Sequence, residues 1–482
     1  MDNSDSFLNK TLQLSLGYWA VATGVFGAVN GTLYILYGKH VFRTLIQQGP
    51  ISITPLTVAS VAVVWLALGI ALALLRSPAF RASHGITVVC TFFVILLYTN
   101  ILRERTVYGD VGDYIRAAHN LVNHVPFHQR YLYPPFLATT LVPFLPAGDE
   151  AIAGLCWIAN LFSLGLFFVL LSCTLVRYGF GHRLSALLTL GFLVLNVPVL
   201  RTLGYVQINL HVANLVLIAL LCYPRLPILS ALALALAVHL KASPIILVLP
   251  FLLRRDWRWG AWFTVITIGL VCVTLLPYGW RPFSDFLHNI HNVYAANVLS
   301  FRENSVDSIF RCSAQFIGIP LDRVSWLIGI TKVGILTGVL LTLARVIKNE
   351  TFMRTNHPSD AVHNGIPVLM MFMLLGSPLV WEHHPVFVAL PYLLIIKQLT
   401  TPSEWVAYGF AFFLEYHLPT FDFFPWSFGR LLSPLVLLVI MYVTAKRTAD
   451  GSLWHLLAAA KQFLGYPENS NHTSKQIERL SP

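Results

Sequence analysis

Charged residues are scarce in this chain of 482 amino acids, because Asp, Glu, Lys and Arg together make up only 11% of it. Soluble globular proteins carry about 25% charged residues, so this composition cannot cover a water-exposed surface. Hydrophobic residues account for 56% of the chain, and the mean hydropathy is +0.69. These values exclude collagen-like, coiled-coil and disordered chains, and they indicate an integral membrane protein with several spans.

Cysteine is also scarce, and several familiar cofactor motifs are missing. Five of the six cysteines lie in apolar runs and only Cys312 lies in a polar stretch, so no disulfide framework or zinc pattern is present. The sequence contains no P-loop, no G-x-G-x-x-G and no H-E-x-x-H motif. We therefore expect no catalytic metal and no other cofactor.

Basic residues outnumber acidic ones, with 32 Lys and Arg against 21 Asp and Glu and a net charge of +11. In a soluble protein this excess would suggest a nucleic-acid partner. In a membrane protein it is better explained by basic residues retained on the cytoplasmic side, so we expect no nucleic acid to bind.

Long apolar runs predict an all-α polytopic membrane protein with roughly 11–13 transmembrane helices. Several runs are short or broken by proline, which is tolerated where a helix lines an enclosed cavity. We expect one transmembrane domain over 1–447 and a cytoplasmic tail over 448–482. The runs lie at about 14–38, 55–76, 86–102, 134–146, 151–175, 184–200, 208–222, 227–253, 259–277, 323–346, 366–380, 386–398, 404–417 and 430–445.

Basic clusters indicate the orientation of these helices. Placing Arg254–Arg258, Arg345–Arg354 and Lys446–Arg447 inside puts the 278–322 loop, the segment around 377–386 and the 418–430 loop outside. If the amino terminus is inside, the three helices that follow it put the 103–132 loop outside too. If Arg177 and Arg183 are also inside, the 134–146 run is re-entrant or interfacial. Such an arrangement fits a bacterial inner membrane with an active site on the periplasmic side. There, an enzyme needs an activated donor carried by a lipid.

Two polar motifs could supply acid–base chemistry. In the first, Asp110 and Asp113 precede Tyr114 and Arg116, and a partly buried carboxylate of this kind can serve as a general base. Two solvated loop acids would look the same. The second motif is Glu382-His383-His384, at a membrane boundary where ionisable groups usually line a functional cavity. An interfacial aromatic loop is the alternative there.

Three further features could bind phosphate or sugar. Lys241 lies in an apolar run just before Pro244, and it either serves a lipid phosphate or extends its ammonium group to the interface. The Gln207-x-Asn209 pair either joins the same cavity or links helices. In the outer segment, the residues suited to phosphate or sugar hydroxyls are Arg302, Asn304 and Arg311, although an ordinary solvated loop would look similar.

The order of these motifs resembles glycosyltransferase family 87, the membrane-embedded polyprenol-phosphate-mannose-dependent mannosyltransferases of the GT-C superfamily. The similarity spans about 105–400. In this chain three apolar runs precede the loop acid, whereas such enzymes often have one. The elements that carry the resemblance are Asp110 with Tyr114 and Ala117-Ala118, Tyr133-Pro134-Pro135-Phe136, Gln207-x-Asn209, Lys241-x-x-Pro244, Asn304-Ser305 to Arg311, and Ser377-Pro378-x-x-Trp381-x-His383-His384.

The resemblance implies an inverting hexosyltransferase of the EC 2.4 class. Asp110, or alternatively Asp113, would deprotonate an acceptor hydroxyl on a glycolipid or glycan. That hydroxyl would attack a sugar carried on polyprenyl phosphate, with mannose as the family default and arabinofuranose as a variation.

The resemblance also implies roles for the other polar residues. Lys241, Arg302 and Arg311 would stabilise the leaving phosphate. The remaining substrate-binding residues would be Tyr114, Arg116, Tyr133, Gln207, Asn209, Asn304, Glu382, His383 and His384. A secondary transporter or lipid flippase, or a non-catalytic scaffold, remains the alternative.

Overall fold

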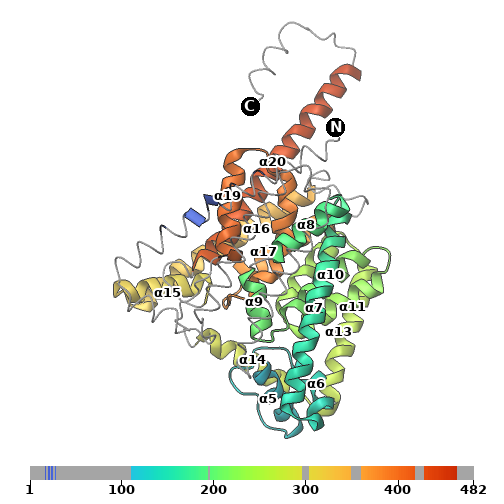
Figure 1. Cartoon of the computed structure of the whole chain (residues 1–482), viewed down its shortest axis with the longest axis vertical. Coiled ribbons are helices and arrows are strands. Elements are labelled where there is room, and N and C mark those ends of the chain that lie inside the picture. The colour runs from blue at the N-terminus through green and yellow to red at the C-terminus, as the bar shows by residue number, and fades with distance from the viewer. Residues whose placement is uncertain are drawn as a thin grey trace.

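The computed structural model describes residues 110–193, 196–295, 303–348, 360–417 and 428–463, together with seven isolated positions before residue 29. Within these ranges the secondary structure is helical, apart from one antiparallel bridge between Glu303 and Trp381 (Figure 1). The predicted runs at 14–38, 55–76 and 86–102 lie almost wholly outside the described residues, and Arg302 also lies outside them.

Four helices in the described ranges are long and apolar enough to cross a membrane, which confirms the predicted all-α polytopic membrane protein. A fifth candidate is a pair of helices, α8 (His182–Leu193) and α9 (Val197–Gly204), bent by 64°. The four long helices are α7 (Asp149–Arg177), α13 (Trp257–Tyr278), α16 (Ser325–Lys348) and α20 (Gly429–Phe463).

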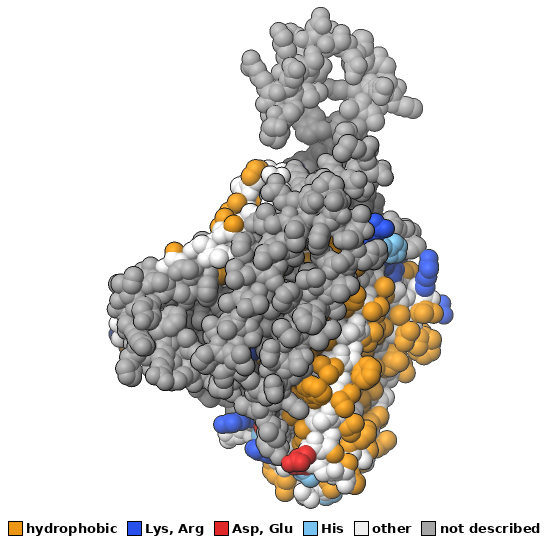
Figure 2. Space-filling model, in the orientation of Figure 1, with side chains coloured by type: hydrophobic (Ala, Val, Ile, Leu, Met, Phe, Trp, Pro, Cys, Tyr) orange, Lys and Arg blue, Asp and Glu red, His pale blue; other side chains and the backbone are white. Residues whose placement is uncertain are grey.

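These long helices keep many large apolar side chains on the surface. On α7, Leu155, Phe162 and Leu166 are among the exposed residues, and they recur at helical spacing. Figure 2 shows hydrophobic side chains gathered in a broad band over the face where α7 and α13 lie in Figure 1. Such a band is stable against lipid tails and costly in water.

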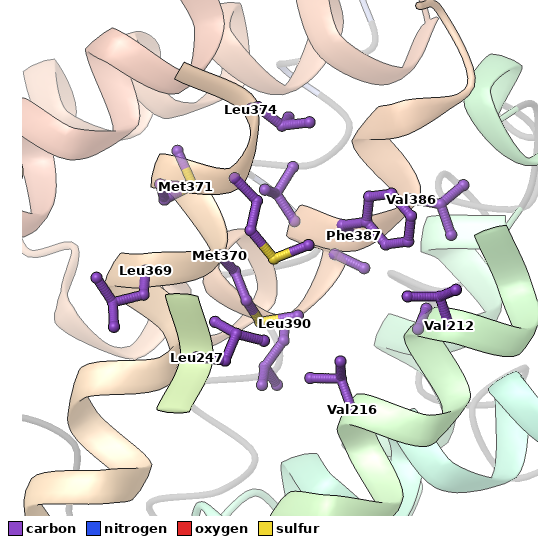
Figure 3. Packing of buried hydrophobic residues seen from close by; sticks show 14 of the residues in the cluster. Val212, Val216, Leu247, Leu369, Met370, Met371, Leu374, Val386, Phe387 and Leu390 are labelled. Carbon is purple, nitrogen blue, oxygen red and sulfur yellow. The ribbon is translucent and has the colours of Figure 1, made fainter. Parts of the chain in front are cut away.

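Shorter helices fill the interior, and several of them begin with proline in the first turn, where its missing N–H group has no helical partner to lose. Figure 3 shows Val212, Leu247, Met370 and Phe387 from four of these segments packing together. The shorter helical segments, of which all but η1 contain buried residues, are α6 (Pro135–Leu141), η1 (Val142–Ala147), α10 (Asn209–Cys222), α11 (Pro227–Leu240), η2 (Ser243–Val248), α12 (Leu249–Leu253), α17 (Asp360–Leu375), η4 (His384–Val388), α18 (Ala389–Ile395), η5 (Ile396–Gln398), α19 (Pro402–Phe412) and η6 (Phe413–His417).

The described parts of the two predicted outer loops contain helices, which corrects the expectation of irregular chain there, while their side of the membrane stays a prediction. Residues of the first form α5 (Asp110–Val122), and the second contains α14 (Arg281–Ala295) and α15 (Val306–Ile317), followed by η3 (Leu321–Val324). These stretches are amphipathic: on α5, Val111, Tyr114 and Leu121 are buried while polar residues lie outward. Such helices have too few apolar residues to stand out in a search for continuous runs.

The path of the chain explains the short run at 134–146. His119 on α5 lies 2.8 Å from Asp149 at the start of α7, so the α6–η1 segment begins and ends beside α5. Helix α7 then extends from Asp149 to Arg177. The Arg177 side chain donates hydrogen bonds to the carbonyls of Leu220 and Leu221 at the end of α10. At the other end of the chain, α20 continues beyond the predicted boundary at 447 to Phe463.

Candidate functional site

Asp110 lies in the first turn of α5, partly buried and within electrostatic reach of Lys241. The pKa of the Asp110 carboxyl is raised from its usual 3.8 to about 7, and burial is the largest cause. The negative charge of Asp113 also raises this pKa, and the positive charge of Lys241 opposes both effects. A carboxyl with such a pKa is half ionised near neutral pH, where a general base works best.

Asp113, the alternative base, faces a different partner. Its Oδ1 lies 3.0 Å from Nε2 of His128, in the segment between α5 and α6. The Asp113 side chain is 28% exposed. Of the two predicted acids, Asp110 therefore lies within electrostatic reach of the partly buried Lys241, and Asp113 is paired with His128.

Gln207 connects the two tyrosines that follow the acids in the sequence. Its Oε1 accepts hydrogen bonds from the Tyr114 hydroxyl over 2.9 Å and from the Tyr133 hydroxyl over 3.0 Å. The two tyrosine rings meet edge to face, with their centroids 4.9 Å apart. Tyr131 holds the turn into α6 by donating to the Pro134 carbonyl and accepting from the Ala138 amide.

Lys241 follows the end of α11 in extended backbone, because the helix stops before the Pro244 turn. Its Nζ donates a hydrogen bond to Asn209 Oδ1 over 3.0 Å, and it lies 5.1 Å from the centre of the Phe387 ring. Asn209 is fully buried at the start of α10, and its Nδ2 donates to the His383 carbonyl over 3.2 Å. The structure thus joins three of the predicted motifs at one point.

The Glu382 side chain forms a buried ion pair that the sequence analysis missed. Its Oε1 lies 2.9 Å from Nε of Arg201 on α9, and both side chains are only 8% exposed. Of the two histidines that follow, His384 accepts a hydrogen bond at Nδ1 from the Trp381 amide. The sequence signal for Arg201 was a cation directly after the apolar run 184–200 and close to Gln207. Charged residues within membrane segments usually pair with another group or line a functional cavity.

Glu303 is a second residue that the sequence analysis missed. It lies just before Asn304 in the predicted polar segment and is 1% exposed. Its Oε1 accepts a hydrogen bond from the Val380 amide over 2.6 Å, and the Asn304 amide donates to the Val380 carbonyl over 2.7 Å. The sequence signal was its position between Arg302 and Asn304, because the sequence analysis selected those two neighbours and passed over the acid between them.

The contacts above define a cluster around Gln207, Asn209 and Lys241, with Asp110, Tyr114, Tyr133 and His383 beside them. Two predicted residues lie outside this cluster. Arg116 is exposed on the outer face of α5. Arg311 lies on α15, which packs against α16 and η3, and the structure gives no contact between Arg311 and Lys241 or His383. Among the described residues, no group of three or more His, Cys, Asp or Glu side chains is arranged to hold a metal ion.

Comparison with known families confirms the family resemblance. The model of glycosyltransferase family 87 matches residues 131–378, more than half of the chain. The chain belongs to glycosyltransferase family 87. The match includes Tyr133, Gln207, Asn209 and Lys241, whereas Asp110 precedes it and the two histidines follow it.

A curated relative is also similar to this chain. The polyprenol-phosphate-mannose-dependent alpha-(1-2)-phosphatidylinositol mannoside mannosyltransferase of Mycobacterium tuberculosis is 28% identical over an alignment of 285 residues that covers 56% of this chain. The aligned part spans 62% of that relative's length. No solved structure matches the chain.

Proposed function

We propose that this family 87 protein is an inverting glycosyltransferase, which moves mannose from a polyprenyl-phosphate donor to a hydroxyl of a lipid or glycan acceptor. The observation that carries the proposal is that Asp110 lies within electrostatic reach of the partly buried Lys241, although the two residues are 131 positions apart in the chain. A base beside a cation is what this reaction needs, since one group must accept a proton while another faces a departing phosphate.

The proposed step is a single displacement. Asp110 removes the proton from the acceptor hydroxyl, whose oxygen forms a bond to the anomeric carbon of the sugar. The bond from that carbon to the phosphate oxygen breaks on the opposite face, so the configuration inverts, and polyprenyl phosphate leaves with the electron pair. Lys241 stabilises the negative charge that develops on the phosphate.

The remaining cluster fixes these two groups relative to each other. Gln207 holds Tyr114, one turn after Asp110 on α5, and it also holds Tyr133 at the entry to α6. Asn209 lies two residues after Gln207 and holds Lys241. One short segment at the start of α10 therefore sets both the base and the cation, which is how a fold keeps reacting groups in a productive geometry.

We place the reaction on the extracytoplasmic side of the membrane. Arg177 lies at the end of α7 away from α5, and it donates a hydrogen bond to the Tyr223 carbonyl. The Tyr223 hydroxyl donates to Asp256, whose neighbours in the sequence include the basic residues Arg254, Arg255 and Arg258. By the positive-inside rule, that end faces the cytoplasm and the α5 end faces outward. An outward site has no access to cytoplasmic nucleotide sugars, which favours a lipid-borne donor.

The test uses purified protein in lipid nanodiscs with polyprenyl-phosphate-mannose and a phosphatidylinositol mannoside acceptor. Wild type should release polyprenyl phosphate and mannosylate the acceptor, whereas Asp110→Asn should bind the donor and release none. Transfer retained by Asp110→Asn would refute the base assignment. Donor lipid moved across the bilayer without transfer, measured in vesicles, would instead identify a flippase.

A further inference from the structure

The segment Val380–His384 is fastened on one side by the strand-like stretch Glu303–Ser305. Glu303 Oε1 accepts from the Val380 amide over 2.6 Å, and Oε2 accepts from the Ser305 hydroxyl over 2.7 Å. The antiparallel bridge between Glu303 and Trp381 continues the same pairing. Because Glu303 is 1% exposed, water cannot replace these hydrogen bonds.

On its other side the same segment contacts the proposed site. The His383 carbonyl accepts hydrogen bonds from Asn209 Nδ2 over 3.2 Å and from the Thr202 hydroxyl over 3.4 Å. Asn209 in turn accepts the hydrogen bond from Lys241. A continuous set of contacts therefore runs from the Glu303 carboxylate to the ammonium group of Lys241.

The two ends of this set of contacts differ in how strongly they are fixed. Lys241 has a flexible side chain, and its direction depends on Asn209 Oδ1. Asn209 can present that oxygen only while its amide nitrogen is held by the His383 carbonyl, since rotation of the amide would exchange the two atoms. The position of that carbonyl depends on the backbone of Val380–His384, which Glu303 holds at its first residue.

We propose that Glu303 is a positioning residue for donor binding: it holds Val380–His384 in the register that lets His383 orient Asn209, and Asn209 orient Lys241. This inference rests on the proposed function for its meaning, because Lys241 is taken there as the group that faces the donor phosphate. It predicts that loss of Glu303 weakens binding of the phosphate, while Asp110 keeps its role as the base.

The variants separate the hydrogen bond from the charge. Glu303→Gln keeps an oxygen that can accept from the Val380 amide, while Glu303→Ala removes it. Glu303→Asp keeps the charge but moves the carboxylate back by one methylene, away from the Val380 amide. It tests the hydrogen bond if the alanine variant fails to fold. The control is Glu404→Ala, which removes a carboxylate paired with Arg447 at the start of α19, outside this set of contacts.

Two measurements are made on each variant. Equilibrium binding of polyprenyl monophosphate should weaken about tenfold in Glu303→Ala and by less than about threefold in Glu303→Gln, with no change in Glu404→Ala. Amide hydrogen exchange of the peptide covering 378–386 should become faster in Glu303→Ala and Glu303→Asp, and stay as in wild type in Glu303→Gln and Glu404→Ala. With the mannosyl donor, the KM of Glu303→Ala should rise about tenfold, by more than kcat falls, and the acid limb of kcat/KM should move to higher pH, because the charge of Lys241 lowers the pKa of Asp110.

Opposite results overturn the inference in identifiable ways. Unchanged exchange in Glu303→Ala would show that Glu303 does not hold the segment. Faster exchange with unchanged phosphate binding would show that the segment does not position Lys241. Neither readout requires turnover, so a wild-type protein that binds and exchanges as expected but transfers no mannose would refute the proposed function and leave the positioning role standing.

Discussion

Lys241 donates a hydrogen bond from Nζ to Asn209 Oδ1 over 3.0 Å, and these two residues come from segments that each looked ambiguous in the sequence. A lone lysine in an apolar run can extend to the interface, and a lone asparagine can link two helices. Their contact shows that the ammonium group turns inward. It also faces Phe387, whose ring centre lies 5.1 Å away.

Replacing this lysine should weaken donor binding more than it slows the chemical step. We expect Lys241→Met to raise the KM for the polyprenyl-phosphate donor about 10- to 100-fold, the range set by the loss of one charged hydrogen bond to phosphate. Lys397→Met is the control, since Lys397 also donates from its ammonium group to an oxygen, the Tyr178 carbonyl, but does so far from the cluster. Steady-state kinetics at varied donor concentration measure KM and kcat for each of the two variants. Equal increases in the two variants would show a general loss of structure.

The two acids of α5 should separate clearly in their effects. Asp113→Asn should keep at least about a tenth of the wild-type turnover, because Asp113 is paired with His128 and lies nearer the surface. Asp110→Asn should lose all measurable turnover, since an amide cannot accept the acceptor proton. Initial rates of polyprenyl phosphate release compare the two. The reverse pattern would make Asp113 the base.

The pH dependence of kcat/KM should report the Asp110 carboxyl. The base works only when ionised, and its pKa is raised to about 7, so kcat/KM should fall about tenfold for each pH unit below 7. Asp113 raises this pKa and Lys241 lowers it. Asp113→Asn should therefore move the acid limb to lower pH, and Lys241→Met should move it to higher pH. A limb that stays fixed in both variants would belong to another group.

Much of the fold was predictable because it follows from hydrophobic content over windows of about 20 residues. The spans at α7, α13, α16 and α20 were all predicted as apolar runs. The helices α5 and α14 were predicted as loops, because an amphipathic helix that packs on a membrane protein has no continuous apolar run. Their helical character lies in the spacing of residues such as Val111, Tyr114 and Leu121.

The candidate site was predictable where a residue was unusual for its place. Lys241, and the motif around Asp110, stood out because charges are rare in this chain. Glu303 did not stand out, because its importance comes from a backbone amide 77 residues later, and no local pattern encodes such a contact. Arg116 shows the reverse error: it lay within the motif, but the helical period turns it outward.

The Arg201–Glu382 ion pair gives a test of whether Glu382 binds substrate or supports the fold. Breaking a buried pair leaves one charge unpaired and costs about 3–5 kcal/mol, whereas replacing both partners by apolar residues of similar volume is often nearly neutral. We expect Arg201→Met and Glu382→Leu each to lower the midpoint of thermal unfolding in detergent strongly. The double variant should recover most of that loss, because neither partner then remains charged.

Donor binding in the double variant decides the role of Glu382. Arg201 and Glu382 lie on the side of the cluster where Tyr205 donates to Glu382 over 3.5 Å, and Lys241 reaches the cluster through Asn209 instead. If the pair is structural, the double variant should bind polyprenyl monophosphate within about threefold of wild type. Restored stability with binding still lost would instead show that one of the two side chains contacts the donor, and the two single variants would identify which.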